Sequence, residues 1–197
     1  MNTWTWIVIL GLVAFYVWST YNGFVTMLGR IRAAVQEIGN QLKRQAELIP
    51  NLEASAKGYL KHETEIFKRL TEARKAVTAA AASGDLSQGA MATEKLAKVL
   101  PEIRVVVESN PEIKGAEVVT QLMDELRDTS DKAMYARRTL IDLSADYNIK
   151  LATFPSNLIA KMFGFKQEAG LKMTDDGVAV ATSVSDEDMK APKVKLD

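Results

Sequence analysis

The sequence predicts an all-α protein in which an N-terminal transmembrane helix continues into a long antiparallel helical bundle. Three observations predict this fold. No charged side chain precedes Arg30 in the 197-residue chain. Beyond Tyr21, apolar residues recur at the three-four spacing of amphipathic helices. Ahead of residue 166, no segment alternates apolar and polar residues with the period of a strand over a useful length. Helices that each have one line of apolar side chains must bury it by packing on one another.

Residues 4–24 form the predicted transmembrane helix. The chain is almost entirely apolar from Trp4 to Trp18, and a bilayer core of about 30 Å needs about 20 helical residues. Trp4 and Trp6 at one end, with Trp18 and Tyr21 at the other, match the aromatic belts at the two headgroup levels. These four aromatic residues are therefore the predicted membrane anchor.

The charges around the span predict its orientation. No Lys or Arg precedes it, whereas Arg30, Arg32, Lys43 and Arg44 follow, and basic flanks face the cytoplasm. Residues 1–3 are then a short outer N-terminus, and the bulk of this single-pass protein of the cell membrane is cytoplasmic. The alternative, a cleaved signal peptide, would need a basic start and a small-residue cleavage site, and neither is present.

Ser19 and Gly23 form a small-xxx-small pair at the inner end of the span. This spacing allows membrane helices to approach closely, so a dimer contact is one interpretation. The other interpretation is that Gly23 only eases the exit of the chain from the bilayer.

Residues 25–165 are expected to form the cytoplasmic helical bundle. The membrane helix continues into it as one rod, because nothing breaks the pattern before Pro50. The stripe of this rod comprises Val25, Leu28, Ile31, Val35, Ile38, Leu42 and Ile49.

Three further helices and a short one are predicted. The second stripe runs from Leu52 to Val77 and stops at Gly84; the third segment spans 86–107, where Pro101 should kink it or begin a new helix. The fourth stripe extends from Val118 to Leu151. In the short helix that follows, Ser156 is the expected N-cap, Leu158 to Phe163 form the helix, and Gly164 closes it.

The last segment, 166–197, changes character and is predicted to be a flexible C-terminal tail, since it is poor in apolar residues and rich in turn formers. Within it, residues 178–184 alternate at the strand period. Addition of this stretch as a strand to a partner or a neighbouring copy is the alternative.

The order and spacing of several motifs resemble the LemA family of bacterial membrane-anchored helical proteins. The blocks Leu48-Ile-Pro-Asn-Leu52 and Phe154-Pro-Ser-Asn-Leu-Ile-Ala160 carry the resemblance, together with Tyr21-Asn22, Tyr135-Ala-Arg137 and Tyr147-Asn148. The resemblance covers nearly the whole chain. It implies a single N-terminal anchor and a helical domain inside the cell. Some relatives are associated with magnetosome membranes, which suggests membrane organisation or remodelling.

Two positions depart from the family pattern. Ser130-Asp131 stands where the family usually has a glutamate ahead of Tyr-Ala-Arg, and Leu140-Ile141 stands where a second Tyr-Asn pair would follow. Asn22, Tyr147 and Asn148 remain the candidate interhelical or interaction positions, because a tyrosine can bury its ring while polar groups satisfy neighbours. A ligand site is the alternative for these residues. Phe163-Gly164-Phe165 is expected to pack on the bundle rather than enter the membrane.

Composition argues against several function classes. Equal numbers of basic and acidic side chains, 25 of each, argue against a nucleic-acid binder. The chain has no cysteine, and His62 is its single histidine, so zinc-thiolate and two-histidine sites are excluded. We predict no enzyme activity, no catalytic or metal-binding residue, no cofactor, no nucleic-acid partner and no small-molecule substrate. A hydrolase or metal site built from Glu63, Glu65 and Glu72 is a further alternative.

These observations predict a non-catalytic, membrane-anchored helical-bundle scaffold or interaction protein. Its expected partners are the lipid bilayer and either further copies of the chain, as a homo-oligomer, or other membrane proteins. The alternative function is a membrane-organising or remodelling protein that binds lipid.

Overall fold

The computed structural model describes residues 3–110, 115–168 and 170. Its helices are, in chain order, α1 (Thr3–Ala56), the 3-10 helix η1 (Tyr59–Lys61), α2 (Thr64–Ser83), α3 (Leu86–Ser109), α4 (Ala116–Ala152) and α5 (Ser156–Phe163). The part of the chain described is all-α, so the predicted fold class is confirmed. Most of the predicted tail, including the alternating stretch 178–184, lies outside the described residues.

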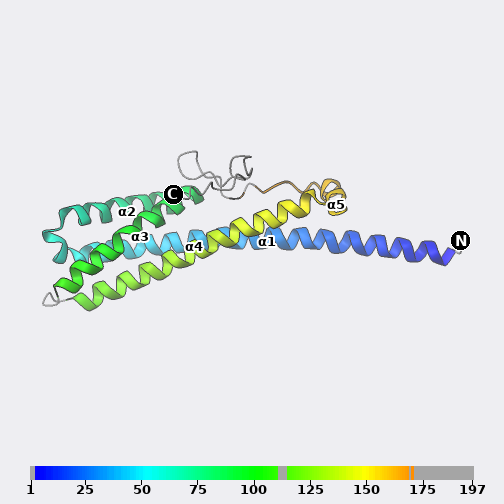
Figure 1. The fold of residues 1–197 in the computed structure, drawn as a ribbon. Helices are drawn as coiled ribbons and strands as arrows, with labels where there is room; N and C mark the ends of the chain where they lie inside the picture. Colours follow the sequence, from blue (N-terminus) through cyan, green and yellow to red (C-terminus); the bar gives the residue numbers. More distant parts are fainter. Residues whose placement is uncertain (1–2, 111–114, 169, 171–197) are drawn as a thin grey trace, which may run out of the picture.

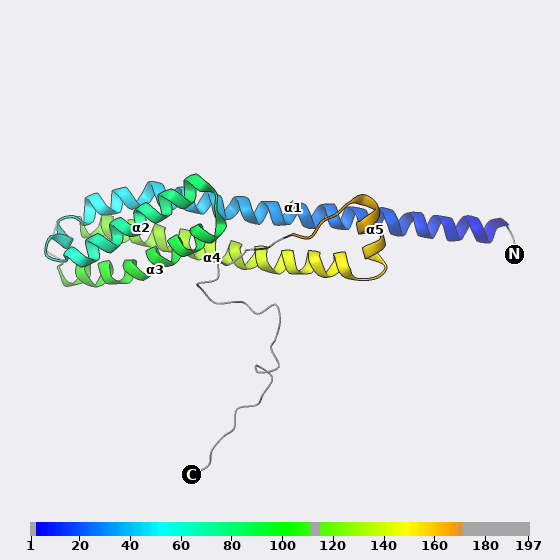
Figure 2. The ribbon, with the colours of Figure 1, turned by 90° about the horizontal axis from the view of Figure 1, so that it is seen from above.

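The helices form an elongated molecule with two regions (Figures 1 and 2). α1 and α4 lie antiparallel and side by side along most of the length of α4. At the end away from the N-terminus, α2 and α3 pack against this pair, and we call the resulting four-helix region the head. The N-terminal part of α1 extends beyond all the other helices. The predicted antiparallel bundle therefore begins well inside α1.

α1 buries a stripe with a seven-residue repeat. Ile31, Ile38, Gln45 and Leu52 are buried at intervals of seven, and Leu42, Ile49 and Ala56 form a second series with the same interval. This is the pattern with which two helices remain in contact over many turns. The predicted stripe is correct at Ile31, Ile38, Leu42 and Ile49, but Val25 and Val35 are exposed.

α1 does not stop at Pro50, where the sequence pattern placed a boundary. It continues to Ala56, and the turn into α2 occupies residues 57–63, which include η1. Pro50 lies on the exposed side, whereas Ile49 and Leu52 beside it are completely buried. Packing of these neighbours maintains the helix across a residue that lacks an amide donor.

Pro101 likewise lies inside a continuous helix, so the alternative that it begins a new helix is wrong. Its ring is on the exposed side of α3, and Leu100 and Ile103 are buried on the opposite side. The helix ends that depend on glycine are as predicted. Gly84 and Gly164 have φ of 68° and 71°, the left-handed conformation that ends helices.

At Gly89, α3 lies close to the Leu42 side chain of α1. A Cβ atom at this position would lie 2.6 Å from Cδ1 of Leu42, which is 2% exposed and has little space to move into. We expect Gly89→Val to lower the free energy of unfolding by about 1–3 kcal/mol through overpacking. Gly39→Val is the matched control, because nothing lies within 4 Å of an added Cβ atom. The control should change stability by no more than about 0.5 kcal/mol, since valine and glycine differ little in helix propensity. Urea denaturation in mild detergent measures both, and equal effects would contradict the close approach.

Candidate functional site

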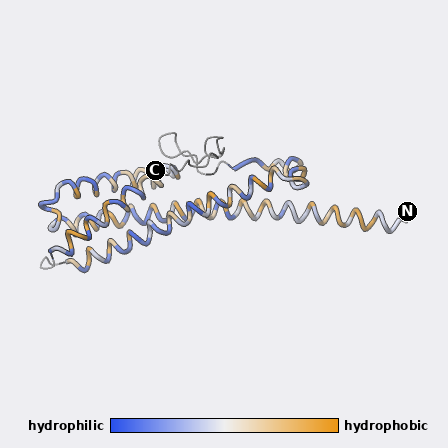
Figure 3. Tube along the Cα trace, viewed as in Figure 1, coloured by the Kyte–Doolittle hydropathy of each residue, from blue (hydrophilic) through white to orange (hydrophobic). Residues whose placement is uncertain are grey.

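The N-terminal part of α1 carries the predicted membrane anchor. Trp4, Trp6 and Trp18 are 76%, 53% and 61% exposed. Most of the apolar side chains between them are also exposed. α1 is a helix long and apolar enough to cross a membrane. Figure 3 shows apolar residues concentrated along the part of α1 that projects from the bundle. Exposed apolar side chains on a helix of this length are expected where lipid, rather than water, surrounds the helix.

Where α1 meets the rest of the protein, five rings from three parts of the chain form a cluster. We define the aromatic cluster as Tyr21 and Phe24 of α1, Tyr147 of α4, and Phe163 and Phe165 at the end of α5 and just after it. The Tyr21 centroid lies 4.9 Å from that of Phe163, and the Phe24 centroid lies 4.8 Å from that of Phe165. The Tyr147 ring meets Phe24 edge-on at 5.7 Å. These separations are in the range where aromatic pairs add stability beyond their buried area.

The centre of the aromatic cluster is fully enclosed and its edge is open. Phe24 and Tyr147 have no exposed surface, whereas Tyr21 and Phe163 are 38% and 48% exposed. The ammonium of Lys150 lies 5.1 Å from the Phe24 ring centroid, a cation–π arrangement. The cluster therefore joins α1, α4 and α5 at the level where the predicted span ends.

Gly23 lies beside the end of the Lys150 side chain. A Cβ atom at Gly23 would collide with the ammonium of Lys150 from α4. In the folded chain this glycine thus faces a helix of its own bundle, while Ser19, the other member of the small-residue pair, is exposed. Gly23 therefore lies beside α4, but its neighbour is the end of a flexible lysine side chain that can move, so the contact does not by itself require glycine.

The turn between α4 and α5 directs α5 back to the aromatic cluster. It contains a cis peptide bond between Phe154 and Pro155. The Ser156 hydroxyl is 2.6 Å from the carbonyl oxygen of Lys150 and 2.8 Å from that of Thr153. The predicted N-cap role of Ser156 is wrong: the hydroxyl donates backwards to the end of α4, because the turn brings those free carbonyls within reach.

Asn148 fixes the segment that follows α5. Its side-chain amide donates to the carbonyl oxygen of Glu168 at 2.8 Å, and its side-chain oxygen accepts from the amide of Glu168 at 3.0 Å. This pair of bonds holds the segment along α4, so that Phe165 reaches Phe24. Tyr147 and Asn148 thus sit at the aromatic cluster, whereas Asn22 is exposed and is not part of it.

Burial changes the acid strength of the central phenol. Desolvation, followed by the charge of Glu168, raises the pKa of Tyr147 above its ordinary value near 10. The folded state therefore holds this proton more tightly than the unfolded state. The protonated Tyr147 phenol therefore contributes to the free energy of unfolding. This contribution is complete below about pH 10 and is lost as pH rises through the raised pKa.

We expect this effect to show as a loss of stability at alkaline pH that depends on Tyr147. The free energy of unfolding, measured in detergent from about pH 9 upwards, should fall less steeply in Tyr147→Phe than in the wild type. Tyr135→Phe is the control, because Tyr135 is 75% exposed and lies on the same helix. Identical slopes for all three proteins would contradict the assignment.

In the head, a buried polar layer joins three helices. Gln45 of α1 is completely buried, and its amide nitrogen lies 3.3 Å from the hydroxyl of Ser130 in α4. Its oxygen lies 3.5 Å from the hydroxyl of Thr93 in α3. Ser130, one of the departures from the family pattern, therefore has a partner in the core. At the other departure, Leu140 is buried and Ile141 is 43% exposed.

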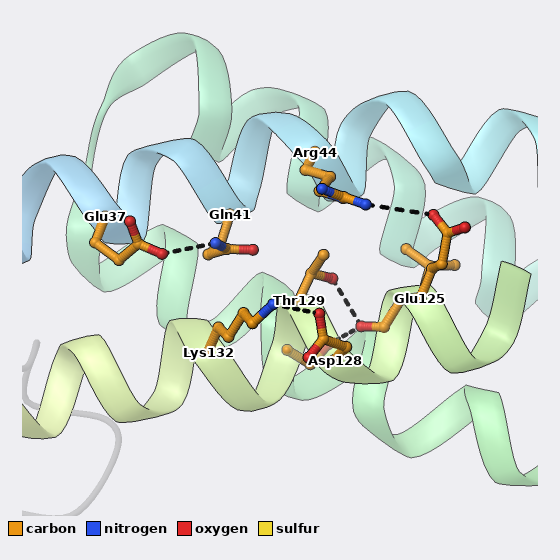
Figure 4. A network of polar contacts seen from close by, with 9 residues as sticks. Glu37, Gln41, Arg44, Glu125, Asp128, Thr129 and Lys132 are labelled. Carbon is orange, nitrogen blue, oxygen red and sulfur yellow. Dashed lines mark hydrogen bonds and ion pairs between the residues drawn. The ribbon is translucent and has the colours of Figure 1, made fainter.

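On the surface beside this layer, charged side chains connect α1 to α4 (Figure 4). Arg44 approaches Glu125 at 3.6 Å, and both are solvated. Other contacts in the view lie within one helix, such as Lys132 with Asp128 at 2.6 Å. Pairs of this kind align neighbouring helices but contribute little stability.

No concentration of reactive groups stands out among the described residues. His62, Glu63 and Glu65 are exposed, and no group of three or more His, Asp or Glu side chains in the described ranges could hold a metal ion. A cavity of about 350 Å³ lies between α3 and α4, where Arg104 is already paired with Asp124. The aromatic cluster is the candidate region, and its contacts are those of packing.

Comparison with known proteins agrees with this architecture. The magnetosome protein MamQ of Magnetospirillum gryphiswaldense is 24% identical over 187 aligned residues, which cover 81% of this chain and 68% of the relative. Both the membrane-compatible helix and this relative support a membrane-associated helical protein. The model of the LemA family matches residues 34–185, well over half of the chain. The protein belongs to the LemA family.

Proposed function

We propose that the protein is a non-catalytic scaffold that is anchored in the cell membrane by residues 4–24 and holds its head away from the bilayer in the cytoplasm. The observation that carries the proposal is the continuity of α1, which is 54 residues long and belongs both to the anchor and to the head. From Tyr21 to Ala56, a helix rises about 50 Å at 1.5 Å per residue. The head is therefore held at a fixed distance rather than on a flexible linker.

The charge pattern supports the cytoplasmic orientation. Arg30, Arg32, Lys43 and Arg44 follow the span within α1, and residues 3–29 carry no charged side chain. Basic residues next to a span remain on the cytoplasmic side. Because α4 returns antiparallel to α1, α5 comes back to the part of α1 at which the predicted span ends.

Self-association is the interaction that we assign to the scaffold. Several large apolar side chains on α4 are unpartnered in the single chain: Tyr135 is 75% exposed, Ile149 is 64% exposed and Ile141 is 43% exposed. Tyr135 and Ile149 are fourteen residues apart, which places them on one side of the helix. A second copy lying alongside would cover them.

The mass of the intact complex in mild detergent tests this function. We expect a multiple of the 21.7 kDa chain, and cross-linking in cells should trap the same species. Tyr135→Glu combined with Ile149→Glu should shift the mass towards one chain, whereas Met91→Glu on α3, at a site that is 50% exposed, should not. A strictly monomeric protein without a cross-linked partner would contradict the scaffold.

A second candidate function is membrane organisation or remodelling through lipid binding. Two observations favour it: the relative MamQ is a magnetosome protein, and α5 exposes apolar side chains next to the end of the span. Deformation of vesicles by the full-length protein, seen by electron microscopy at increasing protein-to-lipid ratios, tests it. Vesicles that keep their shape at every ratio would remove this function.

A further inference from the structure

α5 has apolar residues on two sides, and only one side is covered. Ile159 and Ala160 face the bundle and are 8% and 1% exposed. On the opposite side, Leu158 and Met162 are 55% and 62% exposed, and they are neighbours one turn apart. Phe154, on the turn before α5, is 74% exposed. A short helix with an open apolar face needs a second apolar surface.

The position of α5 indicates which surface this is. Phe163, its last residue, packs on Tyr21, and the following Phe165 packs on both Tyr21 and Phe24. These are the residues at which the predicted span ends. α5 is therefore held at the level where the predicted span of α1 ends.

The direction of α5 fits the same surface. Figure 2 shows α5 crossing from the end of α4 towards α1, and in Figure 1 it is seen nearly end-on. A helix that lies across the transmembrane helix lies along the membrane plane. Helices that bind at the interface adopt this direction and bury one apolar face at the boundary between headgroups and acyl chains.

The charges beside the open face are basic. Lys161 lies between Leu158 and Met162 in sequence and is exposed, and Lys166 is exposed just after the helix. Lysine side chains at this depth extend their ammonium groups to the headgroups, where anionic lipids attract them. Apolar and basic groups together match the chemistry of an inner leaflet.

We propose that α5 lies in the headgroup region of the bilayer that α1 crosses, with Phe154, Leu158 and Met162 at the acyl boundary and Lys161 among the headgroups. This inference rests on the proposed anchoring by α1. With α5 in place, the protein contacts the membrane at two points joined by the aromatic cluster. The second point fixes the rotation and tilt of the rod, which a single helix leaves free.

Single-cysteine variants of the full-length chain test the depth of α5, since the natural sequence has no cysteine. An environment-sensitive nitrobenzoxadiazole fluorophore is attached at Leu158→Cys or Met162→Cys. The protein is placed in phosphatidylcholine–phosphatidylglycerol vesicles with nitroxide spin labels on the acyl chains, which quench this fluorophore when they are close to it. The matched control is Val118→Cys, which is 51% exposed at the opposite end of α4. We expect quenching at 158 and 162 to exceed that at 118 several-fold.

A label at Leu12→Cys separates this inference from the proposed anchoring, since Leu12 lies within the span and is 65% exposed in the isolated chain. Quenching at 12 without excess quenching at 158 and 162 would overturn the placement of α5 and leave the anchor intact. Absence of quenching at 12 would overturn the anchor and, with it, the placement of α5. If oxidation links Leu158→Cys between copies while its label remains unquenched, the open face belongs to a second chain and the proposal is wrong.

Discussion

Tyr147→Ala is expected to lower the free energy of unfolding by about 3–5 kcal/mol, the usual cost of deleting a fully buried aromatic ring. The ring has no exposed surface and meets Phe24 edge-on at 5.7 Å. Its loss leaves a cavity at the point where α1, α4 and the segment after α5 meet. Urea denaturation of the full-length protein in mild detergent, followed by circular dichroism, measures the change.

Val105→Ala is the control for this prediction, because it truncates a side chain that is 63% exposed on α3 and lies outside the proposed self-association surface. It should change stability by no more than about 0.5 kcal/mol. Tyr147→Ala should also accelerate hydrogen exchange of the amides in α5, since the aromatic cluster holds this helix in place. Equal effects of the two substitutions would show that the cluster does not stabilise the bundle.

Arg74→Ala is expected to have the second-largest effect, a loss of about 2–3 kcal/mol. Arg74 of α2 donates to Glu53 of α1 at 2.6 Å, and the Glu53 side chain is only 10% exposed. Removal of the arginine leaves a carboxylate that is mostly withdrawn from water and has no partner. Thermal unfolding and urea denaturation both measure the loss.

Two further variants isolate the pair. Arg69→Ala breaks an ion pair of similar length with Glu102, at 2.7 Å, but the two side chains are 44% and 36% exposed. It should therefore cost less than about 1 kcal/mol. Adding Glu53→Gln to Arg74→Ala should recover part of the lost stability, because the unpaired charge is removed. If Arg69→Ala and Arg74→Ala cost the same, burial of Glu53 does not govern the effect.

The fold follows from the sequence to a large extent, because its main signals are local. The spacing of apolar residues in α1 indicates a helix. Gly84 and Gly164 indicate helix ends, because glycine readily adopts the positive φ that both residues have in the structure. The errors in the helix boundaries occur at Pro50 and Pro101, where proline normally disfavours a helix. At both prolines, neighbouring residues of the same helix are buried against other helices, and this packing maintains the helix. A local sequence pattern does not show which residues will be buried by tertiary packing.

The candidate site was predicted only in part. Tyr21, Tyr147 and Asn148 were singled out, and the structure brings all three to the aromatic cluster region. Phe24 was not, because inside an apolar span it cannot be distinguished from a lipid-facing residue. Lys150 was missed because its position depends on how α4 packs on Gly23 of α1, more than a hundred residues away.

The buried polar residues of the head were missed for a related reason. Gln45 occupies a position in the seven-residue series that apolar residues otherwise fill. That placement was the available signal, since a polar residue in such a series often marks a register-setting contact. Its partners Thr93 and Ser130 come from helices whose register against α1 is set by the whole bundle.

In the proposed arrangement, one continuous helix crosses the membrane and carries the head on the cytoplasmic side. Labelling of single cysteines with a membrane-impermeant maleimide tests it most directly. Thr3→Cys and Lys61→Cys are both exposed and lie at opposite ends of the rod. We expect residue 3 to react in intact cells whose outer membrane is permeabilised, and residue 61 to react only after lysis. Reaction of residue 61 in intact cells would contradict it.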